Sequence, residues 1–236
     1  MSLAQLIWLG AEYHLPSLYS CRVPMSSMNS ALAVPGPGPA TVRLALIRTG
    51  IEVFGLEYVR DELFPQIRAM GIRIRPPEWV ALTPQVLHAY KVDEQAGGTQ
   101  ISTAPISREF AHASGPLTVY IEVPVKDVHH WTKMLGAIGY WGQASSFIYC
   151  TRVFQGMPNP KESITPLRNW NSREPLEPFF SSILSEFRAD TLSWDDVMPV
   201  LSARKAEMLK LDIYVWPMVT VEQHGEGKLL KRKAFA

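Results

Sequence analysis

The stretch LTVYIEVPVKDVHHWTKMLGAI, residues 117–138, decides the fold class. Its first seven residues alternate between apolar and other side chains, which is typical of a β-strand with one buried face. Residues 126–138 then carry apolar side chains at helical spacing, at Val128, Trp131, Leu135 and Ile138. Gly139 and Gly142 bound a tight turn, and residues 145–154 again favour a strand. The stretch therefore predicts a strand–helix–strand unit.

The same order occurs nearer the N-terminus. Residues 4–15, AQLIWLGAEYHL, suit a first strand, and apolar residues at helical spacing predict a helix over 41–69 with a break near Gly55. Thr41 is placed to cap that helix. Residues 72–75 then alternate as a strand. The predicted fold class is α+β, a ferredoxin-like or modified RNA-recognition (RRM) fold built on the split βαβ arrangement.

Residues 85–110 and the C-terminal third are not explained by this pattern. The apolar content of 85–110 is too thin for a core element, so we expect an extended arm or hairpin there. We expect an RRM-like domain over 1–155 and a C-terminal extension over 156–236 that packs on it. In that extension the sequence predicts a proline-rich loop, short helices at 179–187 and 192–209, and a late strand at 211–216.

Composition narrows the class of protein. The 236 residues have a net charge of +1, which argues against a DNA binder coated in positive charge but leaves a local nucleic-acid site open. No apolar run approaches the roughly 20 residues of a membrane span, and the first residues lack the pattern of a signal peptide. Two cysteines without metal-like spacing favour reduced thiols. We expect a cytoplasmic protein with no metal, no cofactor and no membrane partner.

The loop PGPGP, residues 35–39, precedes the first predicted helix and has two interpretations. It is either a plain connector or the approach to a helix N-terminus whose free amides, with Arg43, bind a phosphate. Arg22 would lie near that helix start if the first strand belongs to an RNA-recognition sheet. The second glycine-bearing loop, 139–146, offers Tyr140 or Trp141 as a face for a base.

Several of these pieces together resemble a known family. They are the strand end at 21–24, the proline-rich approach to the first helix, the run ISREF at 106–110 before the 117–123 strand, and IGYWG at 138–142 followed by two serines. In this order and spacing they resemble the fifth CRISPR-associated (Cas) protein family, RAMP-superfamily subunits of type I Cascade complexes. The resemblance spans roughly residues 1–155.

The resemblance implies a non-catalytic subunit with a thumb hairpin that captures the 5′ handle of the crRNA. The partners it implies are the crRNA, the Cascade backbone subunit of the seventh Cas family, the large subunit and, through the complex, target DNA. The candidate RNA-binding residues are Arg22, Ser26, Thr41, Arg43, Arg48, Arg108, Tyr140, Gln143, Ser145 and Ser146.

One subtype of the resembled family is a metal-independent endoribonuclease that processes the precursor transcript. Such an enzyme needs a general acid and a general base near neutral pH. On the predicted thumb, His88, Tyr90 and Lys91 are the candidates for that alternative. A third possibility is a ferredoxin-like domain of unrelated function.

Overall fold

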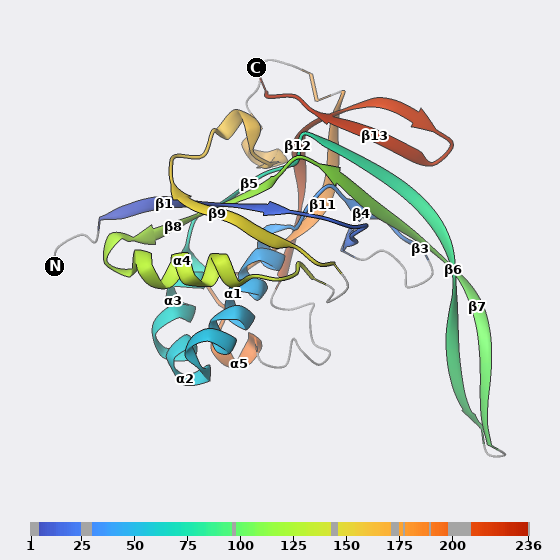
Figure 1. Ribbon diagram of the computed structural model, residues 1–236, viewed down its shortest axis with the longest axis horizontal. Helices are drawn as coiled ribbons and strands as arrows, with labels where there is room; N and C mark the ends of the chain where they lie inside the picture. The colour runs from blue at the N-terminus through green and yellow to red at the C-terminus, as the bar shows by residue number, and fades with distance from the viewer. Residues whose placement is uncertain are drawn as a thin grey trace.

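The computed structural model describes residues 5–24, 30–95, 98–142, 146–170, 175–176, 178–188, 190–197 and 209–235. A four-stranded sheet, with strand order β5-β8-β1-β9 and antiparallel neighbours throughout, lies at its centre. Its strands are β1 (Leu6–His14), β5 (Ile72–Arg75), β8 (Leu117–Pro124) and β9 (Tyr149–Gln155). Helices lie along one face of this sheet (Figure 1). They include α1 (Pro39–Phe54), α2 (Leu56–Tyr58), α3 (Phe64–Ala69) and α4 (Val128–Ala137).

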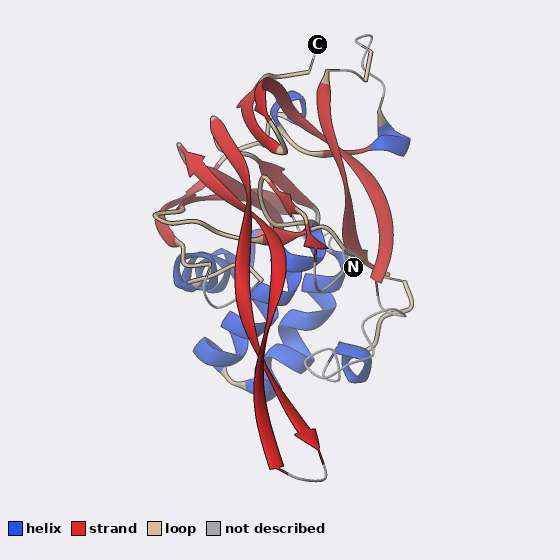
Figure 2. Cartoon of the chain, turned by 90° about the vertical axis from the view of Figure 1, so that its right-hand side faces the viewer, coloured by secondary structure: helices blue, strands red, loops and turns tan. Residues whose placement is uncertain are grey.

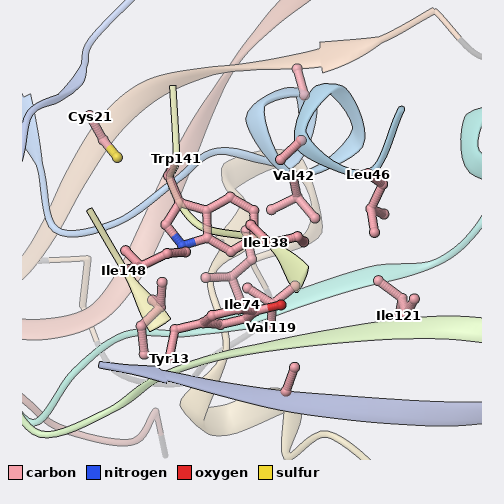
Figure 3. Close-up of a cluster of buried hydrophobic side chains, with 14 of the residues drawn as sticks. Tyr13, Cys21, Val42, Leu46, Ile74, Val119, Ile121, Ile138, Trp141 and Ile148 are labelled. Carbon is pink, nitrogen blue, oxygen red and sulfur yellow. The ribbon is translucent and has the colours of Figure 1, made fainter. Parts of the chain in front are cut away.

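Alternation along the two central strands places the core between sheet and helices. In β8, Leu117, Val119, Ile121 and Val123 are all buried, and they pair across the sheet with the buried side of β1. From α4, Trp131 and Leu135 pack into the same cluster. Figure 3 shows part of this core, with side chains from strands and helices meeting between the layers. The strand and helix predicted over 117–138 are confirmed.

The predicted helix over 41–69 is confirmed with corrections at its start and middle. It begins earlier than expected, with Gly38 as the N-cap residue and Pro39 in the first turn, so Thr41 does not cap it. The chain breaks at Gly55, whose φ of 88° is a left-handed conformation that glycine adopts without strain. A π-helical turn, Val59–Leu63, joins α2 to α3.

Within the described residues, a second, seven-stranded sheet carries a long hairpin. The hairpin consists of β6 (Trp79–Gln95) and β7 (Gly98–Ser114), paired from Trp79↔Ser114 to Gln95↔Gly98. It includes the arm expected over 85–110 and is longer at its base. Its distal half projects away from the rest of the molecule (Figures 1 and 2).

The remaining strands join the hairpin base to the C-terminal part of the chain. Strand β13 pairs with both β6 and β12, and β12 also pairs with β10 and β11. A short strand, β3, runs parallel to β7, and β2 pairs with β4 beside it. Their bounds are β2 (Cys21–Arg22), β3 (Ser30–Ala31), β4 (Ala33–Val34), β10 (Thr165–Pro166), β11 (Phe179–Phe187), β12 (Leu209–His224) and β13 (Gly227–Arg232).

The helix predicted at 179–187 is wrong, because this segment forms strand β11. Its side chains find their buried positions by pairing with β12, which a single-sequence pattern does not reveal. The late strand at 211–216 is confirmed within β12. Of the helix expected at 192–209, the structure describes α5 (Trp194–Val197), and residues 198–208 lie outside the described ranges.

The C-terminal strands share the core of the four-stranded sheet. Leu184, Tyr214 and Trp216 belong to the same buried cluster as Leu46 of α1 and Leu117 of β8. Residues on both sides of position 155 therefore stabilise each other. Among the described helices, none has the length and apolar character that crossing a bilayer requires.

Candidate nucleic-acid interface

The proline–glycine loop before α1 is buried, which contradicts its interpretation as an open phosphate site. Residues 35–39 are all buried. A Cβ added at Gly36 would lie 3.1 Å from Leu117 Cδ1, and one at Gly38 would lie 3.4 Å from Leu184 Cβ of β11. Because β11 packs against the helix start, the glycines serve close packing between the two sheets. The Thr41 helix start is therefore not the place where a phosphate can reach backbone amides.

Arg43 is likewise a structural residue rather than an RNA ligand. Only 6% of it is exposed. Its Nε lies 2.8 Å from Glu186 Oε1, and its two terminal nitrogens donate to the carbonyl oxygens of Ile67 and Met70. The guanidinium therefore joins α1 to β11 and to the end of α3. Its donors are taken up inside the protein, which corrects the prediction that Arg43 binds phosphate.

Two other predicted arginines, Arg22 and Arg108, converge at the base of the hairpin. Arg22 is exposed on β2, and Arg108 is half-buried on β7 with its Nε buried and without a hydrogen bond. Partial burial, and then the charge of Arg108, lower the pKa of the Arg22 guanidinium. Neither side chain forms an ion pair with a carboxylate in the described ranges. Among the described residues, two guanidinium groups are thus held near each other without a counter-charge.

The neighbouring carboxylate, Glu109, forms no ion pair with either arginine in the described ranges and hydrogen-bonds to the backbone instead. Glu109 is buried, and its Oε2 accepts a hydrogen bond of 2.8 Å from the amide of Ala33. The Ser20 hydroxyl donates to the Glu109 carbonyl oxygen at 3.5 Å. Backbone hydrogen bonds join Tyr19 and Ala111 in both directions. These contacts fix β2 and β4 against β7. They therefore fix the backbone positions of Arg22 and Arg108.

Arg48 and Tyr140 form a second cationic element. The Arg48 guanidinium carbon lies 3.4 Å from the centre of the Tyr140 ring, and Nη2 donates to the Tyr140 carbonyl oxygen at 3.3 Å. Glu52 is a weak partner, with 3.7 Å between Arg48 Nε and Oε1. Sequence reasoning missed Phe147, which is 65% exposed and forms a β-bridge with Tyr140. Two aromatic residues and one arginine therefore gather on this loop.

Trp141 does not offer a face to a base, since only 1% of it is exposed. Its indole packs edge-on against Tyr13 with the ring centres 5.1 Å apart. Figure 3 shows the Trp141 ring among Val42, Ile138 and Ile148. The Tyr140 ring therefore points outward and the Trp141 ring points inward. The buried Trp141 ring anchors the loop.

The loop also reaches the arginine pair through Ser146. This serine is buried, and its Oγ accepts a hydrogen bond of 3.3 Å from the Ser20 amide, two residues before Arg22. Ser146 is therefore a link inside the protein, which corrects its assignment as an RNA ligand. Thr41 is half-buried, and its Cγ2 lies 4.0 Å from a Cβ placed at Gly142.

Other predicted residues contribute less to the site. Ser26, Gln143 and Ser145 lie outside the described residues. His88 is exposed on β6 opposite Pro105, whereas the side chains of Tyr90 and Lys91 lie outside what is described. No cluster of three or more His, Cys, Asp or Glu side chains suited to a metal ion occurs within the described ranges.

The two free cysteines allow a check on the geometry beside the site. Cys21, next to Arg22, is buried, and burial raises the pKa of its thiol to about 12. Cys150 is half-buried, and its pKa is raised less. Because the thiolate is the reactive form, iodoacetamide at pH 8 should alkylate Cys150 first and Cys21 only after unfolding. Peptide mass spectrometry measures both rates, and equal rates in the native protein would contradict the packing of β2.

The order of elements, the hairpin and the two cationic groups are the features to compare with known proteins. No protein-family model matches the chain. The CRISPR-associated protein Cas5 of Archaeoglobus fulgidus is 27% identical over 177 residues, which cover 73% of this chain and 76% of that protein. The chain is thus similar to Cas5 over most of its length. The resemblance seen in its sequence motifs is therefore confirmed.

A solved structure shares the fold of this chain. A crystal structure of a CRISPR protein from Archaeoglobus fulgidus superposes with a TM-score of 0.53, at 13% identity, over 97% of this chain and 92% of that one. A chain of a CRISPR RNA-guided surveillance complex is 11% identical and covers 89% and 88%, with a TM-score of 0.38. The first likeness establishes a shared mixed α/β fold with antiparallel sheets, and the second is too distant to add to it.

Proposed function

We propose that this protein is a non-catalytic RNA-binding scaffold subunit of a Cascade-type CRISPR complex and captures the 5′ handle of the crRNA. The observation that carries the proposal is the arginine pair, Arg22 and Arg108, at the base of the hairpin. Among the described residues no carboxylate pairs with either group, so the two guanidinium groups repel each other in the free protein. Phosphates bound to the two arginines would offset that repulsion and supply charge-assisted hydrogen bonds.

The finer description of the fold belongs to the same proposal. We infer a modified RNA-recognition domain of the ferredoxin-like type. Along the chain the elements follow the order β1–α1–β5–β8–α4–β9, which is two strand–helix–strand units. In the sheet order β5-β8-β1-β9, the two strands of each unit are separated by one strand of the other unit. This is the split βαβ arrangement. Strands β6 and β7 are the insertion that makes it a modified form.

RNA would lie across the hairpin base and the loop after α4. Phosphates would contact Arg22 and Arg108, and a base would stack on Tyr140 or Phe147. Arg48, which already covers one face of the Tyr140 ring, adds positive charge there. The start of α1 is not part of this site, because β11 covers it.

The hairpin supports the proposal of protein partners. Beyond the contacts of its base with β13, β3, β4 and Tyr19, the described parts of β6 and β7 pair only with each other. A two-stranded ribbon is at best marginally stable alone, and Val86 on it is 71% exposed. We propose that the hairpin is a thumb that packs against a backbone subunit of the seventh Cas family. Contacts with a large subunit, and through it with target DNA, belong to the same proposal.

Tyr140→Ala provides a prediction for the base-stacking part of this site. Removing the ring should weaken binding of single-stranded handle RNA by about 1–3 kcal/mol, because a base loses its stacking partner. Tyr140→Phe is the matched control and should bind as the unchanged protein does, since it keeps the ring. Fluorescence anisotropy with a labelled RNA measures both, and equal affinities for all three proteins would remove the stacking contact from the account.

The proposal of a non-catalytic role is tested separately. A precursor RNA that contains one repeat is incubated with the protein in EDTA and resolved on a denaturing gel. We expect the RNA to remain intact, because His88 is exposed on the hairpin and nothing in the described residues holds it against a second acid or base. A single cut that His88→Ala abolishes would instead establish the processing endoribonuclease.

Co-expression tests the proposal as a whole. The protein is produced with a CRISPR array and the other subunits of its complex, each assembly is purified through a different subunit, and the bound RNA is sequenced. We expect one discrete small RNA with a fixed 5′ end in assemblies that contain this protein. Absence of the protein from the purified assembly, or the same RNA end without it, would contradict handle capture.

A further inference from the structure

A cavity of about 160 Å³ lies between the two sheets. Residues of β5, β10, β11 and β12, the first residue of α1 and the turn Leu167–Asn169 line it. These segments are far apart in the sequence and meet only in the folded chain. The polar part of this wall consists of Arg73, Arg168, Lys210, Glu186 and Tyr214. Drug-sized ligands occupy pockets of about 300–1,000 Å³, so this one suits a smaller group.

The charge of this cavity is positive. Glu186, its acidic lining residue, already accepts hydrogen bonds of 2.8 Å from Arg43 Nε and from the Phe187 amide. Arg168 Nη1 lies 2.9 Å from Asp212 Oδ2 and keeps its other donors. Counting Arg43 and Asp212 behind the wall, four cationic side chains stand against two carboxylates.

Two of the cations have no partner within the described ranges. Arg73 on β5 and Lys210 on β12 are half-buried, and neither makes an ion pair or hydrogen bond there. Lys210 stands opposite Glu186 in the β11–β12 register, yet Glu186 is engaged by Arg43 instead. Pro39 at the start of α1 has no N–H to offer. The charged groups that line the cavity are side chains.

Tyr214 adds a neutral donor. It is buried, and burial together with the charge of Glu186 raises the pKa of its phenol above the usual range. The hydroxyl thus stays protonated at neutral pH. The described residues give it no hydrogen-bond partner. A guanidinium, an ammonium group and a hydroxyl donor around a small cavity match the acceptors of a phosphate group.

We propose that the cavity lined by Arg73, Lys210, Arg168 and Tyr214 binds a phosphate or diphosphate group. The phosphate belongs either to a free nucleotide or to the end of an RNA chain. This site is separate from Arg22 and Arg108, and it does not rest on RNA capture there.

Isothermal titration of the full chain with inorganic pyrophosphate, in phosphate-free buffer at low salt, tests the site. We expect saturable one-site binding, and a loss of about tenfold or more in affinity for Lys210→Gln and for Arg73→Gln, because each removes a charge-assisted bond. Lys210→Gln is the safer variant for folding, as its ammonium group makes no ion pair or hydrogen bond with the described residues. Arg152→Gln, an exposed arginine paired with Glu12, is the matched control for net charge.

Two further titrations identify the source of the phosphate. If a tetranucleotide with a 5′-phosphate binds more tightly than its 5′-hydroxyl form, and Lys210→Gln removes the difference, the site holds an RNA end. If adenosine monophosphate binds and the two RNAs do not differ, the site holds a free nucleotide. The double variant Arg22→Gln/Arg108→Gln should bind pyrophosphate unchanged, which separates this site from the proposed RNA interface. No saturable binding of pyrophosphate in the millimolar range, or equal binding by Lys210→Gln, would overturn the proposal.

Discussion

Arg43→Met should lower the free energy of unfolding by about 3–5 kcal/mol, the usual cost of removing one partner from a buried ion pair. The variant leaves Glu186 without its 2.8 Å partner and leaves the carbonyl oxygens of Ile67 and Met70 without a donor. These contacts join α1, α3 and β11, so their loss weakens the packing between the helices and the second sheet. Urea denaturation followed by circular dichroism measures the change.

Two comparisons make the Arg43 result specific. Arg152→Met removes an arginine whose side chain is 64% exposed, so the loss of its pair with Glu12 should change the free energy of unfolding far less than Arg43→Met does. Arg43→Met/Glu186→Leu removes both charges and should recover most of the lost stability, because no uncompensated carboxylate remains. If the free energy of unfolding changes by less than about 1 kcal/mol for Arg43→Met alone, this buried pair does not stabilise the contact between α1 and β11.

The second large effect concerns the proposed RNA interface. Arg22→Gln/Arg108→Gln should weaken binding of single-stranded handle RNA by about two orders of magnitude or more, if each arginine contributes about 1.5–3 kcal/mol to a phosphate. The fold should not suffer, because neither guanidinium has a carboxylate partner in the described ranges. Since the charge of Arg108 lowers the pKa of Arg22, removing both charges relieves a repulsion, and the melting temperature should stay the same or rise.

The matched control for this variant is Arg60→Gln/Arg152→Gln. It removes the same net charge from two exposed arginines, which are paired with Asp61 and Glu12. Both double variants change the general electrostatic field of the protein equally. In the control variant this is the only expected change, so its affinity for RNA should fall only slightly. Equal losses for the two double variants would show that net charge, and not the arrangement at the hairpin base, determines binding.

Local patterns were sufficient to predict the four-stranded sheet and its helices. Helical spacing from Val128 to Ile138 reflects burial of one helix face, which the periodicity of that segment shows directly. The alternation in 117–123 also predicted a strand, although residues 117–121 are buried on both faces. The break at Gly55 was visible for the same reason, because a glycine interrupts an apolar stripe. The hairpin was predicted because residues 85–110 contain too few apolar side chains for a core element.

The errors share a different cause, which is packing between distant segments. The sequence predicts an open loop at 35–39 because it contains only prolines and glycines. In the structure β11 and Trp216, which are about 140 or more residues away in the chain, cover it. Arg43 looks like a first-turn cation until Glu186 is placed beside it. Strand β11 itself was predicted as a helix, since its pairing with β12 decides its form. Of the predicted site, Arg22 and Arg108 remain because neither forms an ion pair with a carboxylate in the described ranges. Arg48 and Tyr140 remain as a stacked pair on the loop after α4.

The salt dependence of RNA binding tests the central claim most directly. The logarithm of the affinity for a single-stranded handle RNA is measured against the logarithm of the salt concentration, for the unchanged protein and for Arg22→Gln/Arg108→Gln. Each phosphate contact on a single strand contributes a slope of about −0.7, so loss of both arginines should make the slope shallower by about 1.4. An unchanged slope in the double variant would contradict the claim that these two arginines bind the RNA backbone.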